Sequence, residues 1–253
     1  MCCFSGTQIV QEVKNTRIFA RLGAHGNQTL IYAMSMSAKE DVAMVLPVPV
    51  KPGTQEDAVR FLDFSSYGDV FEHLNACFPI QTTYADPFGA APRGTRSATL
   101  KVISVGAYEA SFVPSIADFT RLDSRFRLPD HVWEKLPGYT SFGFAVFKLR
   151  KGRHDVHPMA FSFPTGRPGH VFFPTLHIHD GEVHEQEVFD HTLYLQGQNL
   201  QMSELWKESR GLAVQTVKCG LTHGIIRPEL HVYKRIIQGT FPNGDIVVKP
   251  KTS

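Results

Sequence analysis

The 253-residue chain lacks a long hydrophobic run, has few cysteines and carries almost no excess of charge. Its longest largely apolar stretches, Val42–Val50 and Phe142–Leu149, fall far short of the roughly 20 residues that a membrane-spanning helix needs. Lys and Arg number 26 and Asp and Glu 24, so no strongly basic surface is expected. These absences exclude a membrane-spanning protein and a dedicated nucleic-acid binder, and we expect neither partner.

The four cysteines are too few for a disulfide-stapled scaffold. The sequence from Met1 has no basic leader followed by an apolar stretch, so no secretory signal is visible. Adjacent Cys2 and Cys3 are poor disulfide partners for each other. We therefore expect a cytoplasmic protein with reduced thiols.

What the chain does have is apolar and aromatic side chains, with 42% hydrophobic residues and 19 Phe. Such a composition excludes a disordered chain. Runs rich in β-branched and aromatic residues, with turn residues between them, predict many strands, and Phe142–Leu149 is apolar enough for a central strand. The fold class we predict is α+β, with a β-dominated mixed or antiparallel sheet and a few short helices.

Helices are expected at a few places only. Thr54–Asp57 resembles a capping box that opens a helix through Phe64, and a second helix is predicted over Asp69–Phe78. A short helix is expected over Ser203–Ser209, and Asn243-Gly244 predicts a tight turn in a C-terminal hairpin. The Gly- and Pro-rich residues 85–98 read as a long loop, so residues 1–253 form a single domain, with a division into two lobes at this loop as the alternative.

Histidine is the unusual residue type, because seven of the 12 lie between His154 and His191. Asp180-Gly181 is a strong hairpin signal. With these two residues as the turn, His177, His179, His184 and Glu182 project from one face, while Leu176, Ile178 and Val183 fill the other. Three convergent imidazoles suit a metal ion with an open coordination position: Cu or Zn first, with Fe or Ni as alternatives. An exposed, His-rich strand face is the other interpretation of the same pattern.

The N-terminus offers a second candidate site. Removal of Met1 would leave Cys2 with its thiol beside its own α-amine, whose pKa of roughly 7.7–8.0 makes it a usable base. This arrangement is typical of N-terminal-nucleophile hydrolases and amidotransferases. The same amine and the thiols of Cys2 and Cys3 could instead bind a soft metal, or the residues could simply be small ones at a chain end.

Several short, largely apolar motifs occur in an order and spacing similar to those of an uncharacterised bacterial family, a domain of unknown function. Many members of that family look secreted and have a mature chain that begins Cys-Gly-Gly. The motifs are Val42–Pro49, Ser104–Ala110, Tyr139, Phe144–Leu149, Pro158 and Phe161–Pro164. The likeness extends to about Gln196, and this chain departs from it by lacking the signal peptide and by reading Cys2-Cys3. The resemblance implies some role for the N-terminal cysteine and no reaction.

From these features we predict a metal-dependent enzyme that acts on a small molecule or peptide. His177, His179 and His184 would hold the ion with Cys2 and Cys3 as further ligands, Glu182 or Asp180 would act as the base, and Cys2 could be the reactive thiol. The first alternative is a hydrolase or amidotransferase with Cys2 as nucleophile. The second is a non-catalytic module that binds a metal or a peptide.

Overall fold

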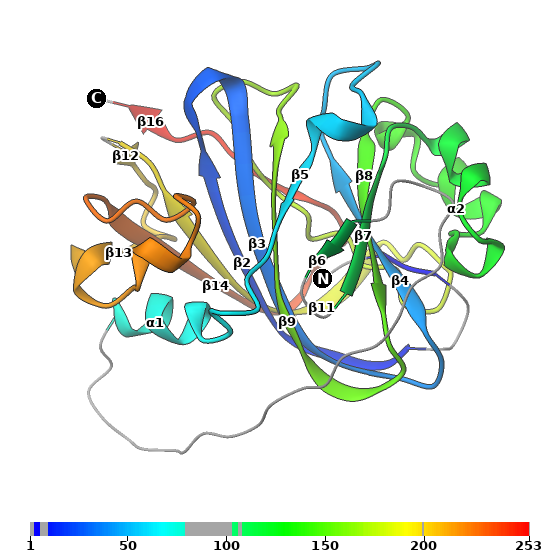
Figure 1. The fold of residues 1–253 in the computed structure, drawn as a ribbon, viewed down its shortest axis with the longest axis horizontal. Coiled ribbons are helices and arrows are strands. Elements are labelled where there is room, and N and C mark those ends of the chain that lie inside the picture. Colours follow the sequence, from blue (N-terminus) through cyan, green and yellow to red (C-terminus); the bar gives the residue numbers. More distant parts are fainter. Residues whose placement is uncertain (1–2, 6–9, 79–102, 106–107, 199, 253) are drawn as a thin grey trace.

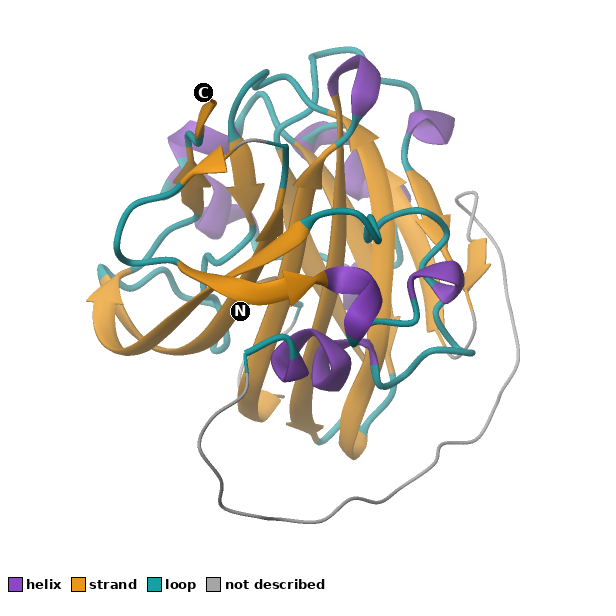
Figure 2. Ribbon diagram, turned by 90° about the vertical axis from the view of Figure 1, so that its left-hand side faces the viewer, coloured by secondary structure: helices purple, strands orange, loops and turns teal. Residues whose placement is uncertain are grey.

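The computed structural model describes residues 3–5, 10–78, 103–105, 108–198 and 200–252. Two β-sheets face each other, and short helices cover the outer face of each sheet (Figure 1). The second view, turned by a right angle, shows how much of the described chain is strand and how short the helices are (Figure 2). The predicted fold class, β-dominated α+β, is confirmed.

One sheet has five strands in the order β1-β4-β8-β7-β6, all antiparallel. Its central strand β8 is the apolar run predicted to be covered on both faces, and it pairs with β4 through Val45↔Val146. The strands are β1 (Cys3–Phe4), β4 (Val42–Val48), β6 (Ile103–Val105), β7 (Tyr108–Val113) and β8 (Gly143–Leu149).

The other sheet has seven strands in the order β13-β14-β11-β2-β3-β9-β5. All of its pairs are antiparallel except β11 with β2, where His191 lies opposite Thr16. The strands are β2 (Val10–Leu22), β3 (Asn27–Ala38), β5 (Arg60–Leu62), β9 (Gly152–Pro164), β11 (Gln186–Gln196), β13 (Lys207–Leu212) and β14 (His231–Pro242).

The remaining elements are short. Two small ladders pair β10 (Val171–Phe173) with β15 (Ile246–Val248), and β12 (Leu200–Gln201) with β16 (Lys251–Thr252). The α-helices are α1 (Val70–Ala76) and α2 (Asp130–Glu134). Short 3-10 helices occupy Ala24–Gly26, Glu56–Ala58, Ile116–Arg121, Ser124–Phe126, Pro137–Tyr139, Ala213–Gln215 and Cys219–Leu221.

Three apolar clusters hold these layers together, because each sheet has an apolar inner face and a partly covered outer face. The largest cluster lies between the sheets and joins Met44 and Phe147 of one sheet to Leu30 and Leu193 of the other. A second cluster packs α1 against the outer face of the seven-stranded sheet. A third packs α2 and its neighbouring turns against the outer face of the five-stranded sheet.

Several local predictions are wrong. The helix expected from Thr54 to Phe64 is a single 3-10 turn followed by strand β5, and Ser203–Ser209 runs into strand β13 instead of forming a helix. Asn243-Gly244 does not close a hairpin, because β14 pairs with β11 and β13 while β15 pairs with β10. In each case long-range strand pairing overrides the local signal.

The predicted loop at 85–98, with the two-lobe division, lies outside the described residues, so the single-domain prediction stays a prediction. No helix within the described ranges is long and apolar enough to cross a membrane.

Candidate functional site

The histidine-rich segment does not form the predicted hairpin. Residues 174–184 are irregular apart from one bridge, in which Ile178 lies beside Cys3 of β1 in parallel. Asp180-Gly181 does make a turn-like bend, with Gly181 at φ 86°, but no ladder follows it. His177 is therefore not paired across a strand with His184, and the predicted register does not exist.

The alternation of the segment is nevertheless real. Leu176 and Ile178 are buried in the outer cluster of the five-stranded sheet, and Val183 packs against that cluster, as predicted. His177 is fully buried, and its ring lies against Phe189 of β11, with 4.3 Å between the ring centroids. The imidazole of His177 thus faces the protein interior and not solvent or an open cleft.

Three imidazoles form a stack in this interior. The ring of His177 lies between those of His191 and His179, at centroid distances of 5.2 and 5.4 Å and interplanar angles of 18° and 20°. His191 comes from β11 and is fully buried, whereas His179 is partly buried beside Phe4, with ring centroids 5.9 Å apart. The three histidines grouped from the sequence did not include His191, because strand pairing and not sequence proximity brings it to His177.

This geometry does not suit a metal ion. The nitrogen lone pairs of an imidazole lie in the plane of its ring, so nearly parallel stacked rings direct their lone pairs side by side and not toward a common point. Within the described part of the chain, no group of three or more His, Cys, Asp or Glu residues is placed to hold a metal ion. The predicted three-His site of His177, His179 and His184 is wrong.

Burial keeps the stacked imidazoles neutral. Loss of hydration lowers the pKa of His177 to about 2 and that of His179 to about 4, and it lowers the pKa of His191 as well. Among the described residues, neither ring nitrogen of His177 has a hydrogen-bond partner, and its nearest carboxylate is Glu187, 3.9 Å from Nδ1. The stack therefore behaves as aromatic packing and not as a set of bases.

The backbone of the segment is fixed by side chains from the turn between β14 and β15. The Asn243 amide accepts from the His177 N–H at 2.8 Å and donates to the carbonyls of His177 and His184 at 2.9 and 3.0 Å. The Asp245 carboxylate accepts from the N–H groups of Thr175 and Leu176 at 2.7 and 2.9 Å. These bonds replace the ladder that a hairpin would have supplied.

Asp245 also accepts a hydrogen bond from the hydroxyl of Tyr139 at 2.8 Å. Its burial raises the pKa of the carboxyl to about 6 in spite of the three donors. The sequence signal Asn243-Gly244-Asp245 marked a turn, but it gave no indication that the turn's side chains bind a distant segment.

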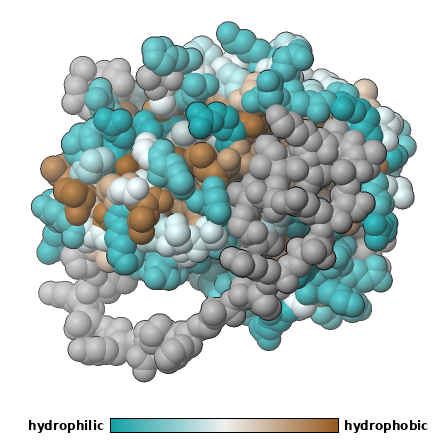
Figure 3. Space-filling view, in the orientation of Figure 1, coloured by the Kyte–Doolittle hydropathy of each residue, from teal (hydrophilic) through white to brown (hydrophobic). Residues whose placement is uncertain are grey.

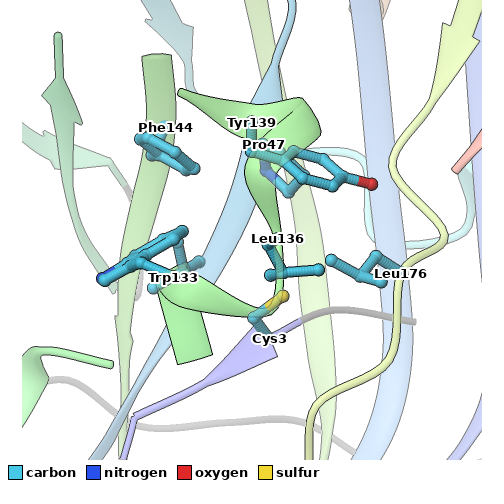
Figure 4. A pocket seen from close by; sticks show the side chains of 8 residues that line it. Cys3, Pro47, Trp133, Leu136, Tyr139, Phe144 and Leu176 are labelled. Carbon is cyan, nitrogen blue, oxygen red and sulfur yellow. The ribbon is translucent and has the colours of Figure 1, made fainter. Parts of the chain in front are cut away.

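The N-terminal strand adjoins the same region. The Phe4 N–H donates to the Ile178 carbonyl at 2.9 Å, so β1 lies between β4 and the segment that contains His177. Cys3 is buried, and its sulfur points into a narrow apolar recess lined by Leu136, Leu176 and other side chains (Figure 4). Cys3 thus packs in an apolar cluster, and its predicted role as a metal ligand together with Cys2 stays a prediction. Cys2 lies outside the described residues.

The remaining predicted site residues lie at the surface. The Glu182 carboxylate accepts a hydrogen bond from Lys135 Nζ at 2.6 Å and lies 3.2 Å from His131 Nε2. Both contacts hold it against α2 and the residue that follows this helix. His184 Nε2 is 2.9 Å from Asp180 Oδ2, and this hydrogen bond raises the pKa of His184. The predicted role of Glu182 or Asp180 as a base depended on the three-His metal site, so it is not supported without that site.

No family model matches the sequence. Among solved structures, the chain is similar to baculovirus P35, with a TM-score of 0.52 and 12% identity over the whole of both chains. It is also similar to a mutated baculovirus P35 after caspase cleavage, with a TM-score of 0.49, 12% identity and coverage of 93% of this chain and 99% of that one. A chain of the caspase-8/P35 complex gives a TM-score of 0.47 at 12% identity, with coverage of 94% and 96%.

At this identity the likeness to P35 shows the fold alone. It is the arrangement of the imidazoles that corrects the functional prediction: the described residues do not form the three-His hairpin site on which the predicted metal-dependent enzyme was built.

Proposed function

We propose that this chain acts by binding a protein, and that the partner is a protease of the caspase class. The observation that carries the proposal is the match in fold to baculovirus P35, which extends over the full length of both chains. P35 itself occurs in a complex with caspase-8 and in a form cleaved by a caspase. A shared fold does not transfer a function by itself, so the proposal needs a direct test.

The nature of the interior supports a binding role. Burial lowers the pKa of His177, His179 and His191, so these stacked imidazoles are neutral packing groups. The buried carboxyl of Asp245 is occupied by three hydrogen-bond donors. Both groups fix the fold, which leaves the surface as the place where the chain meets its partner.

The surface offers apolar contact area. Leu205, Val214 and Leu221 expose 64%, 58% and 42% of their area, and all three belong to the region around β13 and the turns that follow it. Figure 3 shows apolar surface on the side of the molecule where α1 and this region lie. Apolar side chains that gather on one face, unlike singly scattered ones, are typical of surfaces that contact another protein.

The test is a titration of active caspase-8 with the purified full-length chain. We expect peptidase activity to fall in proportion to added chain and the two proteins to elute together in size-exclusion chromatography. Intact mass of the recovered chain shows whether a peptide bond has been cut. Full caspase-8 activity at a large molar excess of the chain, with separate elution, would overturn the proposal.

A pair of matched variants tests whether the β13 region takes part. Leu205→Asp combined with Val214→Asp places charge on two exposed apolar positions, and we expect at least tenfold weaker binding, since burying unpaired charge costs several kcal/mol at an interface. Val188→Asp is the control, because Val188 is 65% exposed on β11, a strand that is not paired with β13. Equal weakening by both variants would show a general effect of charge and remove the β13 region from the interface.

The resemblance to the bacterial family of unknown function stays a prediction, since the likeness to P35 concerns the fold and bears on no bacterial relative. If that resemblance holds, its members should share the two-sheet body and the Asn243–Asp245 contacts described above.

A further inference from the structure

Two cysteines that are far apart in the sequence, Cys77 and Cys219, pack in the same apolar cluster where α1 meets the turns after β13, and Cys77 contributes to the raised pKa of Cys219. Cys77 is the residue at the C-terminal end of α1, and its Sγ lies 2.7 Å from Oγ1 of Thr216. Cys219 follows Thr216 by three residues and packs against the same apolar cluster that contains Cys77. Figure 1 shows α1 next to the turns that follow β13.

The contact between these elements is well fixed. The Tyr67 hydroxyl accepts from the N–H of Lys218 at 2.9 Å and is 3.0 Å from Nδ1 of His73, one of the residues of α1. Cys77 and Cys219 are both reduced in this structure. The backbone on either side of the two thiols is therefore held in place without a covalent link.

The two thiols differ in access and in their neighbours. Cys219 is partly exposed, whereas Cys77 is buried, with 6% of its area exposed. The ammonium of Lys234 lies 4.7 Å from the ring centroid of Phe78, the residue after Cys77, and is 3.2 Å from Asn75 Oδ1 in α1. A cation and the Thr216 hydroxyl thus stand beside the buried thiol, and both favour its thiolate.

We propose that Cys77 and Cys219 form a reversible disulfide by exchange with a low-molecular-weight disulfide such as oxidised glutathione. The exposed Cys219 thiolate attacks one glutathione sulfur, which breaks the glutathione disulfide and releases one glutathione thiolate. The Cys77 thiolate then attacks Sγ of Cys219 and releases the second glutathione. The two protein thiols are oxidised, two glutathione molecules are produced, and the two thiol protons end on them.

The consequence is a redox-controlled link between α1 and the turns after β13. Burial raises the pKa of both thiols, so exchange is slow at neutral pH and accelerates as the pH rises. The link closes a loop that contains the whole chain between Cys77 and Cys219. It therefore stabilises the folded protein mainly by restricting the unfolded chain.

The experiment is incubation of the native full-length chain with oxidised glutathione, followed by intact mass and peptide mapping under non-reducing conditions. We expect the loss of two hydrogen masses, one peptide pair joined through Cys77 and Cys219, and a higher thermal unfolding midpoint that dithiothreitol reverses. Cys77→Ser should stop at a mixed disulfide of Cys219 with glutathione and gain no stability. Cys219→Ser should remain unmodified at Cys77.

Three outcomes would overturn the proposal. They are a wild-type chain that stops at glutathione on Cys219, a cross-link that joins other cysteines, and a Cys219→Ser variant that loses the same two hydrogen masses. Should Cys77→Ser fail to fold, Thr216→Val provides a second test. This change removes the hydroxyl next to Cys77, and we expect it to slow the closure step several-fold while leaving the first glutathione addition at Cys219 unchanged; an unchanged closure rate counts against the assignment.

Discussion

His177 and His184 belong to the same short segment, carry the same side chain and have opposite surroundings. His177 is fully buried among aromatic rings, and burial lowers its pKa to about 2. His184 is exposed at the surface, and its hydrogen bond to Asp180 raises its pKa. The same residue type thus acts as an aromatic packing group at one position and as a solvated, hydrogen-bonded side chain with a raised pKa at the other.

The difference between the two histidines follows from hydration of the charged imidazole. A solvated imidazole keeps its charge at little cost, whereas a buried one without a counter-charge is forced into its neutral form. A histidine-rich sequence therefore does not by itself indicate a metal site, because the fold decides whether ring nitrogens converge or rings stack. Here the interior histidines stack, with His177 between His179 and His191.

The largest expected effect concerns the side chain that fixes the buried half of the segment. Asn243→Ala removes three hydrogen bonds to the backbone at His177 and His184, and we expect the free energy of unfolding to fall by about 3 kcal/mol. Urea denaturation measures it, with Gln198→Ala at an exposed position as the control. A loss equal to that of the control would mean that Asn243 does not hold the segment.

The next effect is a dependence of stability on pH. A histidine whose pKa is lower in the folded than in the unfolded chain contributes stability above about pH 6.5 and loses about 1.4 kcal/mol per pH unit below it. For His179 this loss continues to its folded pKa of about 4, and for His177 to about 2. Asp245 acts in the opposite sense, since its pKa is raised to about 6 and protonation on acidification relieves the cost of its burial.

Because several groups titrate together, the informative quantity is the difference between the wild type and a variant that lacks one buried imidazole. His177→Phe should reduce the loss of unfolding free energy between pH 6 and pH 4 by about 1.4 kcal/mol per pH unit. Urea unfolding at half-unit steps of pH gives both slopes. Parallel curves for the two proteins would show that His177 titrates normally and is not buried as described.

A smaller effect is expected from the same variant at neutral pH. Phenylalanine has a similar shape and no ring nitrogens, so His177→Phe removes the cost of burying polar atoms that lack partners among the described residues. We expect the variant to be about 1 kcal/mol more stable than wild type at pH 7.5. A marked destabilisation would indicate that the imidazole of His177 makes an essential polar interaction.

The smallest effect belongs to the exposed half of the segment. His184→Ala removes one surface contact with Asp180, and we expect a change in the free energy of unfolding below about 0.5 kcal/mol. Thermal and urea unfolding of this variant beside His177→Phe compare the two environments directly. A loss above about 2 kcal/mol at His184 would reverse the comparison.

The sequence predicted the sheets better than the site. Runs such as Val42–Val48 and Phe142–Leu149 are apolar enough to define strands locally, and α1 lies within the predicted Asp69–Phe78. The alternation around Ile178 correctly predicted that Leu176, Ile178 and Val183 pack together. It did not predict that His177 is buried while His184 lies at the surface. What local patterns could not supply is the partner of each face, because that depends on strands β1 and β11, which come from distant parts of the chain.

The site was missed for the same reason. Asp180-Gly181 and Asn243-Gly244 are both strong hairpin signals, yet neither turn closes a hairpin, since the segment 174–184 takes its hydrogen bonds from the Asn243–Asp245 turn and from Phe4. Only the register of β11, which places His191 next to Phe189 and His177, reveals the aromatic character of the stack.

The most direct test of the account is a titration of caspase-8 with wild type and with His177→Phe, carried out in the presence of a strong chelator. The account predicts that both proteins inhibit the peptidase with the same stoichiometry, because the imidazole stack serves the fold and the surface serves the partner. Failure of the folded wild type to inhibit, or inhibition that disappears in His177→Phe or on chelation while the fold is retained, would contradict it.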